Sequence, residues 1–512
     1  MGKIIKGSSL LLVTSLIVKV LSAVYRIPFQ NIVGNEGFYI YQQVYPIYAL
    51  GMTISLTGIP LYISKYVVEF QNDKQKIQQL FTLLLIGCTF IFLFIYFSSS
   101  IIAKLMGDIN LVPLIKVSSF IFLLSPCLAM YRGIYQGNLY LTPTAMSQLL
   151  EQVIRVAVIL VSSIVLVSLN VSLYKVGTMA MIGSIAGSFV ALIVLYLYSV
   201  KKKMGFFKWK LPTVALVKET TKEGLLLVLT VSYLLLFQLI DSFLISNRLQ
   251  DAGLSLSQSR NLKGIFDRGQ PMVQVGLVFT MVFIQALLPL LAKAIQKNDK
   301  LSFMKYQKLL YKLLFLIALP VTLGLVVLMP NIDVLLFEDV QGVRALRIFG
   351  LSIFLISSLQ CFQSIDQSLK KTKTLWFALL SGLIAKLICT YVLTFYYGIC
   401  GASLGTICGL IVANLLYMLL DYRKITCSKQ FFVKYVIILL IYLACLIIFQ
   451  AFLGHSLSNR FSALCLSFAG IFGNGILLLF LIIKSKIFSR EEWAIIPLGE
   501  KIVKIMGCEN EN

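Results

Sequence analysis

Polar and charged side chains recur at helical spacing inside segments that are otherwise apolar. Near the N-terminus, Ser15, Lys19, Ser22 and Arg26 follow one another at steps of four, three and four residues, which places them on one face of a helix. A charged side chain in a membrane-spanning helix costs about 2.5–3.5 kcal/mol on insertion scales, so these groups are expected to face protein or water. The stripe predicts a positively charged aqueous cavity, and structural ion pairs with neighbouring carboxylates are the alternative.

Later apolar segments carry charges of both signs, with positive charge in excess. The cations are Lys19, Arg26, Arg155 and Lys386, with Arg268 near a helix end, and the candidate anions are Glu151, Asp241 and Asp366. Glu151 and Arg155 are four residues apart and could pair within one helix. Asp241 and Lys386 are predicted to bridge two helices, because one helix offers a carboxylate and the other a single cation. The excess favours a diphosphate ligand, because guanidinium groups hold phosphate oxygens in pairs.

Other kinds of site have little support in the sequence. The chain has a single histidine, His455, and its ten cysteines are scattered without metal-ligand spacing, so we predict no catalytic residue, no metal and no cofactor. No nucleotide-binding GxxxxGK[ST] loop occurs, which leaves an ion gradient or the membrane potential to drive any transport. Gln285 shares a helix face with Gln274 in the segment that begins at Arg268, and we add Gln285 to the predicted cavity.

Composition indicates a membrane protein. Of the 512 residues, 59% are hydrophobic and 13% are charged, and the mean hydropathy is +0.90, a profile typical of chains that cross a bilayer many times. The net charge of +24 is spread between apolar runs, which argues against nucleic acid as a partner. We predict an all-α polytopic protein with about fourteen spans. These are residues 8–33, 38–68, 79–101, 112–134, 145–169, 174–200, 223–247, 268–293, 309–330, 343–369, 374–397, 400–420, 431–453 and 461–484.

Lysine and arginine gather at the N-terminus, in the even-numbered loops and in the tail. The segment 201–222 alone holds seven lysines, whereas the loop after the ninth span is acidic. Because loops that are rich in Lys and Arg stay in the cytoplasm, both termini are predicted to lie on the cytoplasmic side of the plasma membrane.

The two halves of the chain share short patterns. Pro60-Leu61 near the end of the second span parallels Pro289-Leu290 near the end of the eighth, and the spacing from Gln136 to Arg155 equals that from Gln367 to Lys386. We predict two six-helix lobes related by pseudo-symmetry, with the substrate at their interface; chance similarity between apolar helices is the alternative. The predicted parts are an N-lobe (1–200), a basic linker (201–222), a C-lobe (223–420), two further helices (421–484) and a cytoplasmic tail (485–512).

Two motifs resemble those of bacterial polysaccharide-precursor exporters. The first contains Arg132-Gly133, Gln136-Gly137, Thr142-Pro143-Thr144-Ala145, Ser147-Gln148 and Glu151-Gln152, followed by Arg155. The second is Asp267-Arg268-Gly269-Gln270-Pro271 with Val273-Gln274-Val275-Gly276. With these motifs the chain resembles the stage V sporulation protein B branch, close to the lipid II flippases, of the MATE-like flippase superfamily.

The resemblance implies a function and some site residues. It implies a flippase in the bacterial plasma membrane that moves an undecaprenyl-diphosphate-linked saccharide, a cell-wall or polysaccharide precursor, by alternating access. Arginines on the first and eighth helices hold the diphosphate in the lipid II flippases, and Arg26 and Arg268 match them. Asp241 resembles the first ligand of the sodium site that some members have, but the eleventh helix offers Lys386 and no carboxylate. The last two helices would supply a groove for the lipid tail.

Partners and rival functions follow from the same residues. The expected partners are the lipid bilayer and the lipid-linked saccharide, with cell-wall synthesis enzymes as candidates, and the protein is expected to act as a monomer. One rival is a MATE-type cation or drug antiporter, which needs a central carboxylate. Another is a membrane glycosyltransferase or polymerase, which needs an acidic catalytic pair. Asp333, Glu338 and Asp339 are the one hint of such a pair, and we expect them to form a solvated loop.

Overall fold

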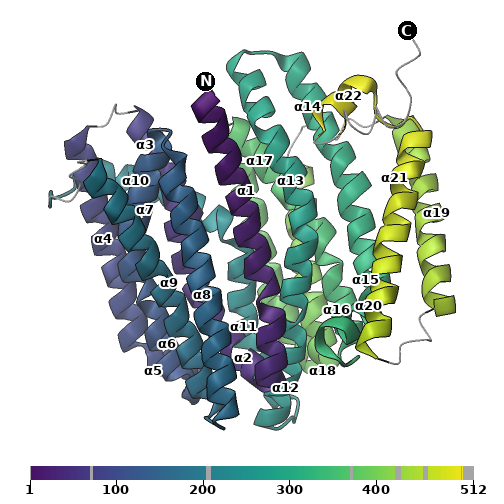
Figure 1. Cartoon of the computed structure of the whole chain (residues 1–512), viewed down its shortest axis with the longest axis horizontal. Coiled ribbons are helices and arrows are strands. Elements are labelled where there is room, and N and C mark those ends of the chain that lie inside the picture. Colours follow the sequence, from purple (N-terminus) through teal and green to yellow (C-terminus); the bar gives the residue numbers. More distant parts are fainter. Residues whose placement is uncertain are drawn as a thin grey trace. The chain divides into compact units, whose positions relative to one another are not determined.

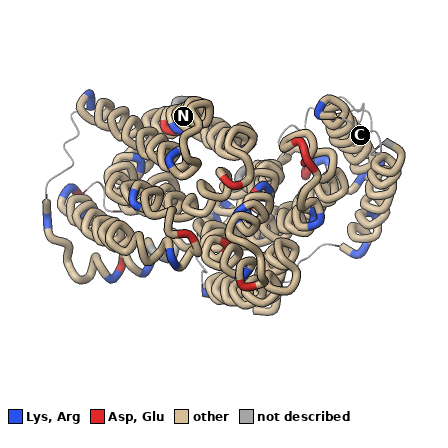
Figure 2. Tube along the Cα trace, turned by 90° about the horizontal axis from the view of Figure 1, so that it is seen from below, with Lys and Arg blue, Asp and Glu red and all other residues tan. Residues whose placement is uncertain are grey.

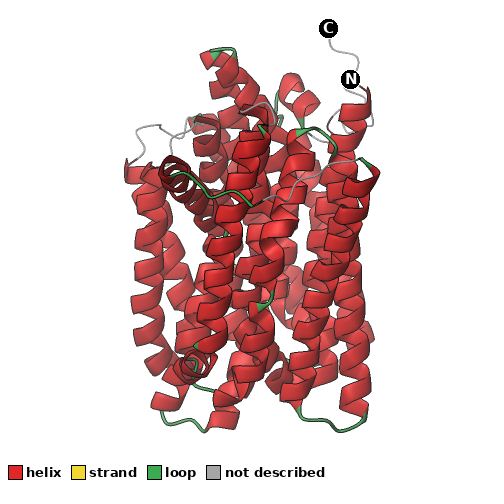
Figure 3. Ribbon diagram, turned by 90° about the vertical axis from the view of Figure 1, so that its left-hand side faces the viewer, coloured by secondary structure: helices red, strands yellow, loops and turns green. Residues whose placement is uncertain are grey.

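The computed structural model describes residues 2–69, 73–202, 209–369, 373–420, 428–453, 459–496 and 499. Within these ranges the regular structure is helical throughout, and no strand occurs in them (Figure 3). The predicted all-α fold is therefore confirmed.

The chain divides into two compact units, Met1–Asp267 and Arg268–Asn512 (Figure 1). The first unit contains α1 (Gly2–Val24), α2 (Arg26–Thr53), η1 (Ile54–Gly58), α3 (Ile59–Glu69), α4 (Lys74–Phe97), α5 (Ser99–Leu105), η2 (Ile109–Leu111), α6 (Val112–Ser119), α7 (Ile121–Gly137), α8 (Leu141–Ser168), α9 (Leu173–Lys201), α10 (Val214–Val231), α11 (Tyr233–Asp251) and α12 (Leu256–Asp267). The second unit contains α13 (Gly269–Gln296), α14 (Lys300–Leu313), η3 (Leu314–Ala318), α15 (Leu319–Phe337), α16 (Val343–Gly350), α17 (Ser352–Leu369), α18 (Lys373–Leu420), α19 (Lys429–Leu453), α20 (Arg460–Phe468), η5 (Ala469–Gly473), α21 (Asn474–Lys484) and α22 (Arg490–Ile495).

The helices are long and apolar enough to cross a bilayer many times. Over the described ranges eleven helical stretches meet this condition, or twelve if the bent pair α10–α11 is one more span. Two of the eleven, Val13–Glu69 with 57 residues and Lys373–Leu420 with 48, far exceed the length of about 20 residues that one crossing needs. Each of these two stretches covers two of the predicted spans. The count of about fourteen crossings stays a prediction.

Single glycines interrupt both long stretches. Gly34 in α2 has a φ of 69° and Gly398 in α18 has a φ of 56°, left-handed conformations that glycine adopts without a steric cost. Loops were predicted at 34–37 and 398–399, between spans. The chain instead resumes a helical course directly after each glycine, so the predicted loops are sharp breaks within continuous helical segments.

The first unit is packed around α2, whose side chains are buried along most of its length. Helices α8 and α9 lie side by side (Figure 1), and the contact is so close that a Cβ at Gly187 would lie 2.5 Å from the carbonyl oxygen of Glu151. Helix α12 approaches α2 equally closely, because a Cβ at Gly264 would lie 2.1 Å from the carbonyl oxygen of Asn35. Glycines thus permit both of these close helix contacts in the first unit.

In the second unit, α13 packs along α14 and α17, and α15 packs against α16, α19 and α20. The two halves of α18 fold back on each other beyond Gly398, where a Cβ at Gly409 would lie 2.7 Å from the Cβ of Lys386. Part of the predicted tail forms the short helix α22, and the Nζ of Lys312 binds both carboxylate oxygens of Glu492 there, at 2.7 and 2.8 Å. This ion pair ties the C-terminal helix to α14.

Charged residues are sparse along the trace (Figure 2). The basic linker predicted at 201–222 is helical from Val214 onward, where α10 begins, and α10 meets α11 at an angle of 69°. Because charged residues are few, a buried charged side chain is a candidate for a functional role. Such buried side chains lie in both units.

Candidate functional site

The predicted polar stripe crosses a junction between two helices. Helix α1 ends at Val24 and α2 begins at Arg26, with Tyr25 between them. Lys19, which is half-buried, and Ser22 lie on α1. Because α1 packs along α8, the Ser22 hydroxyl accepts a hydrogen bond of 3.1 Å from Nη2 of Arg155. The stripe therefore meets the predicted cation of α8.

Arg26 is completely buried, with an exposed fraction of 0%. None of its three guanidinium nitrogens has a hydrogen-bond partner among the described residues. The guanidinium carbon lies 4.3 Å from the centre of the Tyr45 ring, a cation–π contact. A buried cation with neither a hydrogen bond nor a carboxylate in contact is costly, so this group is suited to a ligand that supplies both.

Arg155 lies in the same environment. Its guanidinium carbon is 5.5 Å from the centre of the Tyr25 ring and 5.8 Å from that of Tyr48, and its Nε has no hydrogen-bond partner in the described part of the chain. Tyr25 and Tyr41 join their hydroxyls at 3.0 Å. Tyr25, Tyr41 and Tyr45 act electrostatically on Arg26 and Arg155 alike. We call Tyr25, Arg26, Tyr41, Tyr45, Tyr48 and Arg155 the tyrosine–arginine cluster.

Glu151 does not neutralise this cluster. One of its carboxylate oxygens accepts a hydrogen bond from Nη2 of Arg132 at 2.6 Å, and the other accepts one from the Ser188 hydroxyl at 2.6 Å. Arg132 also donates to Ser147 Oγ and to the carbonyl oxygen of Ser55, each at 3.2 Å. The sequence left open a pairing of Glu151 with Arg155, but Glu151 pairs with Arg132 instead. The charge of Arg155 is therefore not neutralised by Glu151.

Arg268, in the second unit, is engaged by carboxylates. Its Nη1 and Nη2 donate to the two carboxylate oxygens of Asp339 at 2.6 and 2.8 Å, and its guanidinium carbon lies 4.9 Å from the centre of the Phe337 ring. The expectation of a solvated acidic loop is corrected, because Asp333 is buried in α15 and Asp339 binds Arg268; Glu338 alone of the three is well exposed.

The remaining predicted site residues are spread over both units. Asp241 is buried on α11 of the first unit. Lys386 is buried on α18 of the second, with its Nζ 2.5 Å from the Thr406 hydroxyl. The Asp241–Lys386 bridge stays a prediction. Gln285 lies on α13, and its side chain falls outside the described part of the structure.

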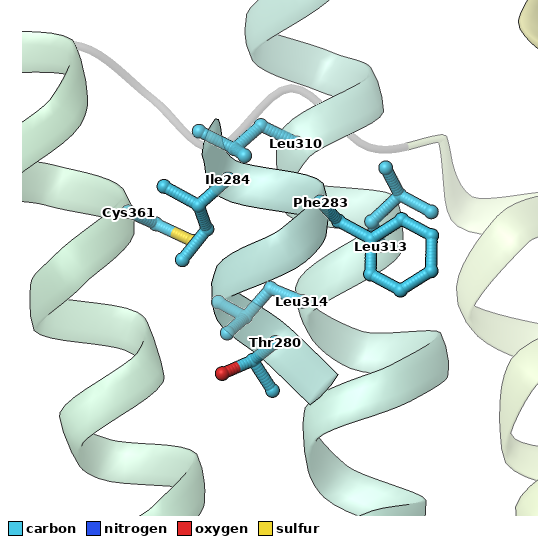
Figure 4. A pocket seen from close by; sticks show the side chains of 7 residues that line it. All are labelled: Thr280, Phe283, Ile284, Leu310, Leu313, Leu314 and Cys361. Carbon is cyan, nitrogen blue, oxygen red and sulfur yellow. The ribbon is translucent and has the colours of Figure 1, made fainter. Parts of the chain in front are cut away.

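A small cavity in the second unit is a packing defect rather than a site. It lies between α13, α14, η3 and α17, and Figure 4 shows its lining: Thr280, Phe283, Ile284, Leu310, Leu313, Leu314 and Cys361. Its volume of about 10 Å³ is at most enough for one water molecule. The only hydroxyl in the lining, that of Thr280, donates to the carbonyl oxygen of Leu277 and accepts from Ser357. No predicted site residue lines this cavity.

The structure adds an ion-pair group that the sequence did not reveal. Arg260 of α12 lies 3.1 Å from a carboxylate oxygen of Glu36 on α2 and 3.1 Å from one of Asp108, which precedes η2. The Tyr174 hydroxyl donates to the same oxygen of Asp108 at 2.6 Å. The signal available in the sequence was weak: isolated charges of opposite sign in short segments between apolar runs.

The two carboxylates that bind Arg260 are expected to differ in their contribution to stability. Asp108 is 1% exposed at its side chain and Glu36 is 36% exposed. Asp108→Asn should lower the free energy of unfolding by about 1–3 kcal/mol, because it leaves buried donors without a charged acceptor. Glu36→Gln should change it by less than about 1 kcal/mol, since water screens that pair. Thermal unfolding of the two purified variants checks this, and equal losses would contradict it.

Comparisons with known proteins agree with the fold and the motifs. The family model described as "Polysaccharide biosynthesis protein" matches residues 4–295. Among proteins of Bacillus subtilis (strain 168), the uncharacterized membrane protein YabM is 35% identical over 99% of this chain and 97% of its own length. The lipid II flippase MurJ is 23% identical over 86% of each chain. Stage V sporulation protein B is 27% identical over 42% of this chain and 43% of its own.

Two solved structures have the same fold. Lipid II flippase MurJ in an inward closed conformation superposes with a TM-score of 0.70, at 15% identity, over 93% of this chain and 99% of that one. An inward-facing multidrug resistance MATE family transporter of the MOP superfamily gives a TM-score of 0.64, at 14% identity, over 78% of this chain and 93% of that one. The resemblance predicted from the motifs is confirmed.

Proposed function

This chain belongs to the family of polysaccharide biosynthesis proteins, and from that membership and its buried cations we propose that it moves an undecaprenyl-diphosphate-linked saccharide across the plasma membrane. It is a multi-pass membrane transporter of the flippase kind rather than an enzyme. The saccharide would be a precursor of the cell wall or of another polysaccharide. Cell-wall synthesis enzymes are proposed partners, and both termini are proposed to lie in the cytoplasm.

The tyrosine–arginine cluster carries the proposal. It holds two buried guanidinium groups, and no carboxylate contacts either of them within the described residues. A diphosphate would supply the missing negative charge and the hydrogen-bond acceptors together, because its oxygens match the paired N–H groups of arginine. The tyrosine rings and hydroxyls around the two cations suit a ligand that also carries sugar.

Four of the five predicted cations receive a role in this proposal. Arg26 and Arg155 hold the phosphate oxygens, and Lys19 adds a point charge further along α1. A diphosphate could reach Arg268 only by displacing Asp339, so the grip of Arg268 on substrate is secondary to that of the cluster. The lipid tail would stay in the bilayer while the headgroup passes, and alternating access would expose the cluster to one side of the membrane at a time.

The rival functions lack matching groups. A cation or drug antiporter would need a carboxylate beside the cluster that is free to bind a cation. Glu151 is bound by Arg132 and Ser188. Asp267, a buried carboxylate on which Arg26 acts, is bound by Lys263. A glycosyltransferase would need a free acidic pair, whereas Asp339 is bound by Arg268 on both oxygens. The same geometry therefore favours anion transport over both alternatives.

Lipid movement in reconstituted vesicles tests the function. Proteoliposomes that contain the full-length protein should move a fluorescently labelled polyprenyl-diphosphate disaccharide between leaflets, measured by quenching with a membrane-impermeant reductant. Protein-free vesicles give the background rate, and ethidium, a cationic dye, probes the antiporter alternative. Movement of ethidium without movement of the diphosphate lipid would reject the proposal in favour of a cation antiporter.

A further inference from the structure

Asp333 is a buried carboxyl group that the proposed substrate site does not use. It lies near the end of α15, its exposed fraction is 0%, and neither of its oxygens has a hydrogen-bond donor within the described residues. The nearest cationic atom is Nη1 of Arg268 at 3.8 Å, which is too far for a hydrogen bond. A carboxylate without donors in such a place is costly, and the cost disappears when the group takes up a proton.

Among the residues that the structure describes, the guanidinium close to Asp333 is that of Arg268, and it is already bound to another carboxylate. Arg268 gives two hydrogen bonds to Asp339, whose side chain is 27% exposed. Burial raises the pKa of Asp339, but the hydrogen bonds from Arg268 and from the N–H of Gln341 outweigh burial and hold this pKa below its ordinary value. Asp339 is therefore the ionised partner of Arg268, and Asp333 is left with the longer 3.8 Å approach of Nη1 and no hydrogen bond from it.

The other elements packed against α15 supply no competing charge. The charged residues of α16, α17 and α20 are Arg344, Arg347, Asp366 and Arg460. Arg460 is held by Glu338. Helix α19 carries Lys429 and Lys434, of which Lys434 donates to the carbonyl oxygen of Ser485, and its Gln450 exchanges two hydrogen bonds with Asn331. The charges that act on Asp333 are those of Arg268 and Asp339. Arg268 thus lies between two carboxyl groups, the partly exposed Asp339 and the buried Asp333.

We propose that Asp333 is a proton-binding site, and that Arg268 exchanges between Asp339 and Asp333 as the proton leaves and returns. In the arrangement seen here Asp333 carries the proton on one carboxylate oxygen and Arg268 is bound to Asp339. When that O–H bond breaks, the proton passes to water, and Arg268 pairs with the Asp333 carboxylate. A shift of Nη1 by about 1 Å gives a charge-assisted hydrogen bond of ordinary length. Asp339 is then hydrated, since it is already partly exposed.

One proton is therefore bound or released for each exchange of Arg268. This would link the movement of α13, which begins directly after Arg268, to the proton gradient. The link to transport rests on the proposed function, but proton binding at Asp333 does not, because it can be measured without substrate.

Infrared difference spectroscopy of the purified full-length protein tests proton binding directly. Between acid and alkaline pH the wild type should lose the carbonyl band of one protonated carboxyl group, and Asp333→Asn should lack that change. Asp339→Asn should keep the band but move its midpoint to lower pH by at least about one unit, a tenfold change in proton affinity, because Arg268 is then free to pair with Asp333. Glu491→Gln, an exposed carboxyl in the same unit, is the matched control and should leave the band unchanged.

The outcomes separate this proposal from the proposed function. A band that persists in Asp333→Asn, or a midpoint that is unchanged in Asp339→Asn, would overturn the proton site whatever the protein transports. Asp339→Asn also keeps the test decisive if Asp333→Asn fails to fold, because Asp333 remains in place. In vesicles, a pH gradient should accelerate movement of the labelled diphosphate lipid by the wild type and have no effect on Asp333→Asn. Wild-type vesicles that fail to move the lipid while the band behaves as expected would reject only the function.

Discussion

Cells that depend on the Arg26→Ala variant are expected to stop exporting the lipid-linked saccharide while keeping normal amounts of the protein in the membrane. The guanidinium of Arg26 contacts no carboxylate and has no hydrogen-bond partner in the described structure, so its removal breaks no ion pair, and Asp267, on which it acts, keeps Lys263. Two charge-assisted hydrogen bonds to a diphosphate are worth about 1.5–3 kcal/mol each. Affinity for the diphosphate lipid should therefore fall by about a hundredfold or more.

The substitutions around this variant separate charge from geometry. Arg26→Lys keeps the charge but loses the paired N–H groups, so transport should be impaired less than by Arg26→Ala. Arg155→Ala should weaken binding similarly, because the same tyrosines surround both cations. Lys104→Ala, which removes an exposed cation of α5, is the matched control. The measurements are complementation beside membrane abundance, and binding of a short polyprenyl diphosphate to purified variants. Normal binding by a well-expressed Arg26→Ala would remove this residue from the site.

Glu151→Ala is expected to act in the opposite way, by preventing accumulation of folded protein. Its carboxylate lies 2.6 Å from Arg132, and the side chains are 1% and 0% exposed. Removing one member of a buried ion pair typically costs about 3–5 kcal/mol, because the other charge stays buried alone. That is a large share of the roughly 5–15 kcal/mol by which domains are stable. The thermal unfolding midpoint in detergent and the abundance in membranes should both fall.

A second substitution distinguishes the ion pair from a mere loss of packing. Glu151→Gln should be more harmful alone than together with Arg132→Gln, since the double variant leaves no uncompensated charge. Glu219→Ala removes an exposed carboxylate from α10 and serves as the control. If Glu151→Ala and Glu151→Gln each unfolded at the same temperature as Glu219→Ala, the ion pair between α7 and α8 would not contribute to stability.

The positions of helices were predictable because a bilayer imposes a length on apolar segments. The predicted spans that end at residues 33 and 397 stop directly before Gly34 and Gly398, where the structure breaks. The hydropathy pattern shows that an apolar segment ends at each of these points. It does not distinguish a loop from a single left-handed residue between two helical runs. That distinction depends on backbone geometry, which leaves no apolar pattern.

Pairings between distant helices were not predictable. Spacing within α8 suggested Arg155 as the partner of Glu151, yet Arg132 on α7 binds it because the two helices lie next to each other. The position of Asp333 after a predicted span end indicates a solvated loop, since an acidic residue there is usually hydrated. It is buried because α15 continues beyond it to Phe337. The cations of the cluster were predicted from the sequence, but Tyr41, Tyr45 and Tyr48 lie on α2 beyond the break at Gly34, and residue spacing alone did not bring them to Arg26 and Arg155.

The order of synthesis decides when the first unit can close. Its core helix α2 is made early, but α12, which covers the segment around Asn35 through Gly264, is among the last parts of the unit to leave the ribosome. Until residue 267 has been inserted, the surface that α2 later buries against α12 lacks that native neighbour. We therefore expect the nascent chain to pass through a stage in which this part of α2 is uncovered by its own unit. A chain truncated after α9 would remain at that stage permanently.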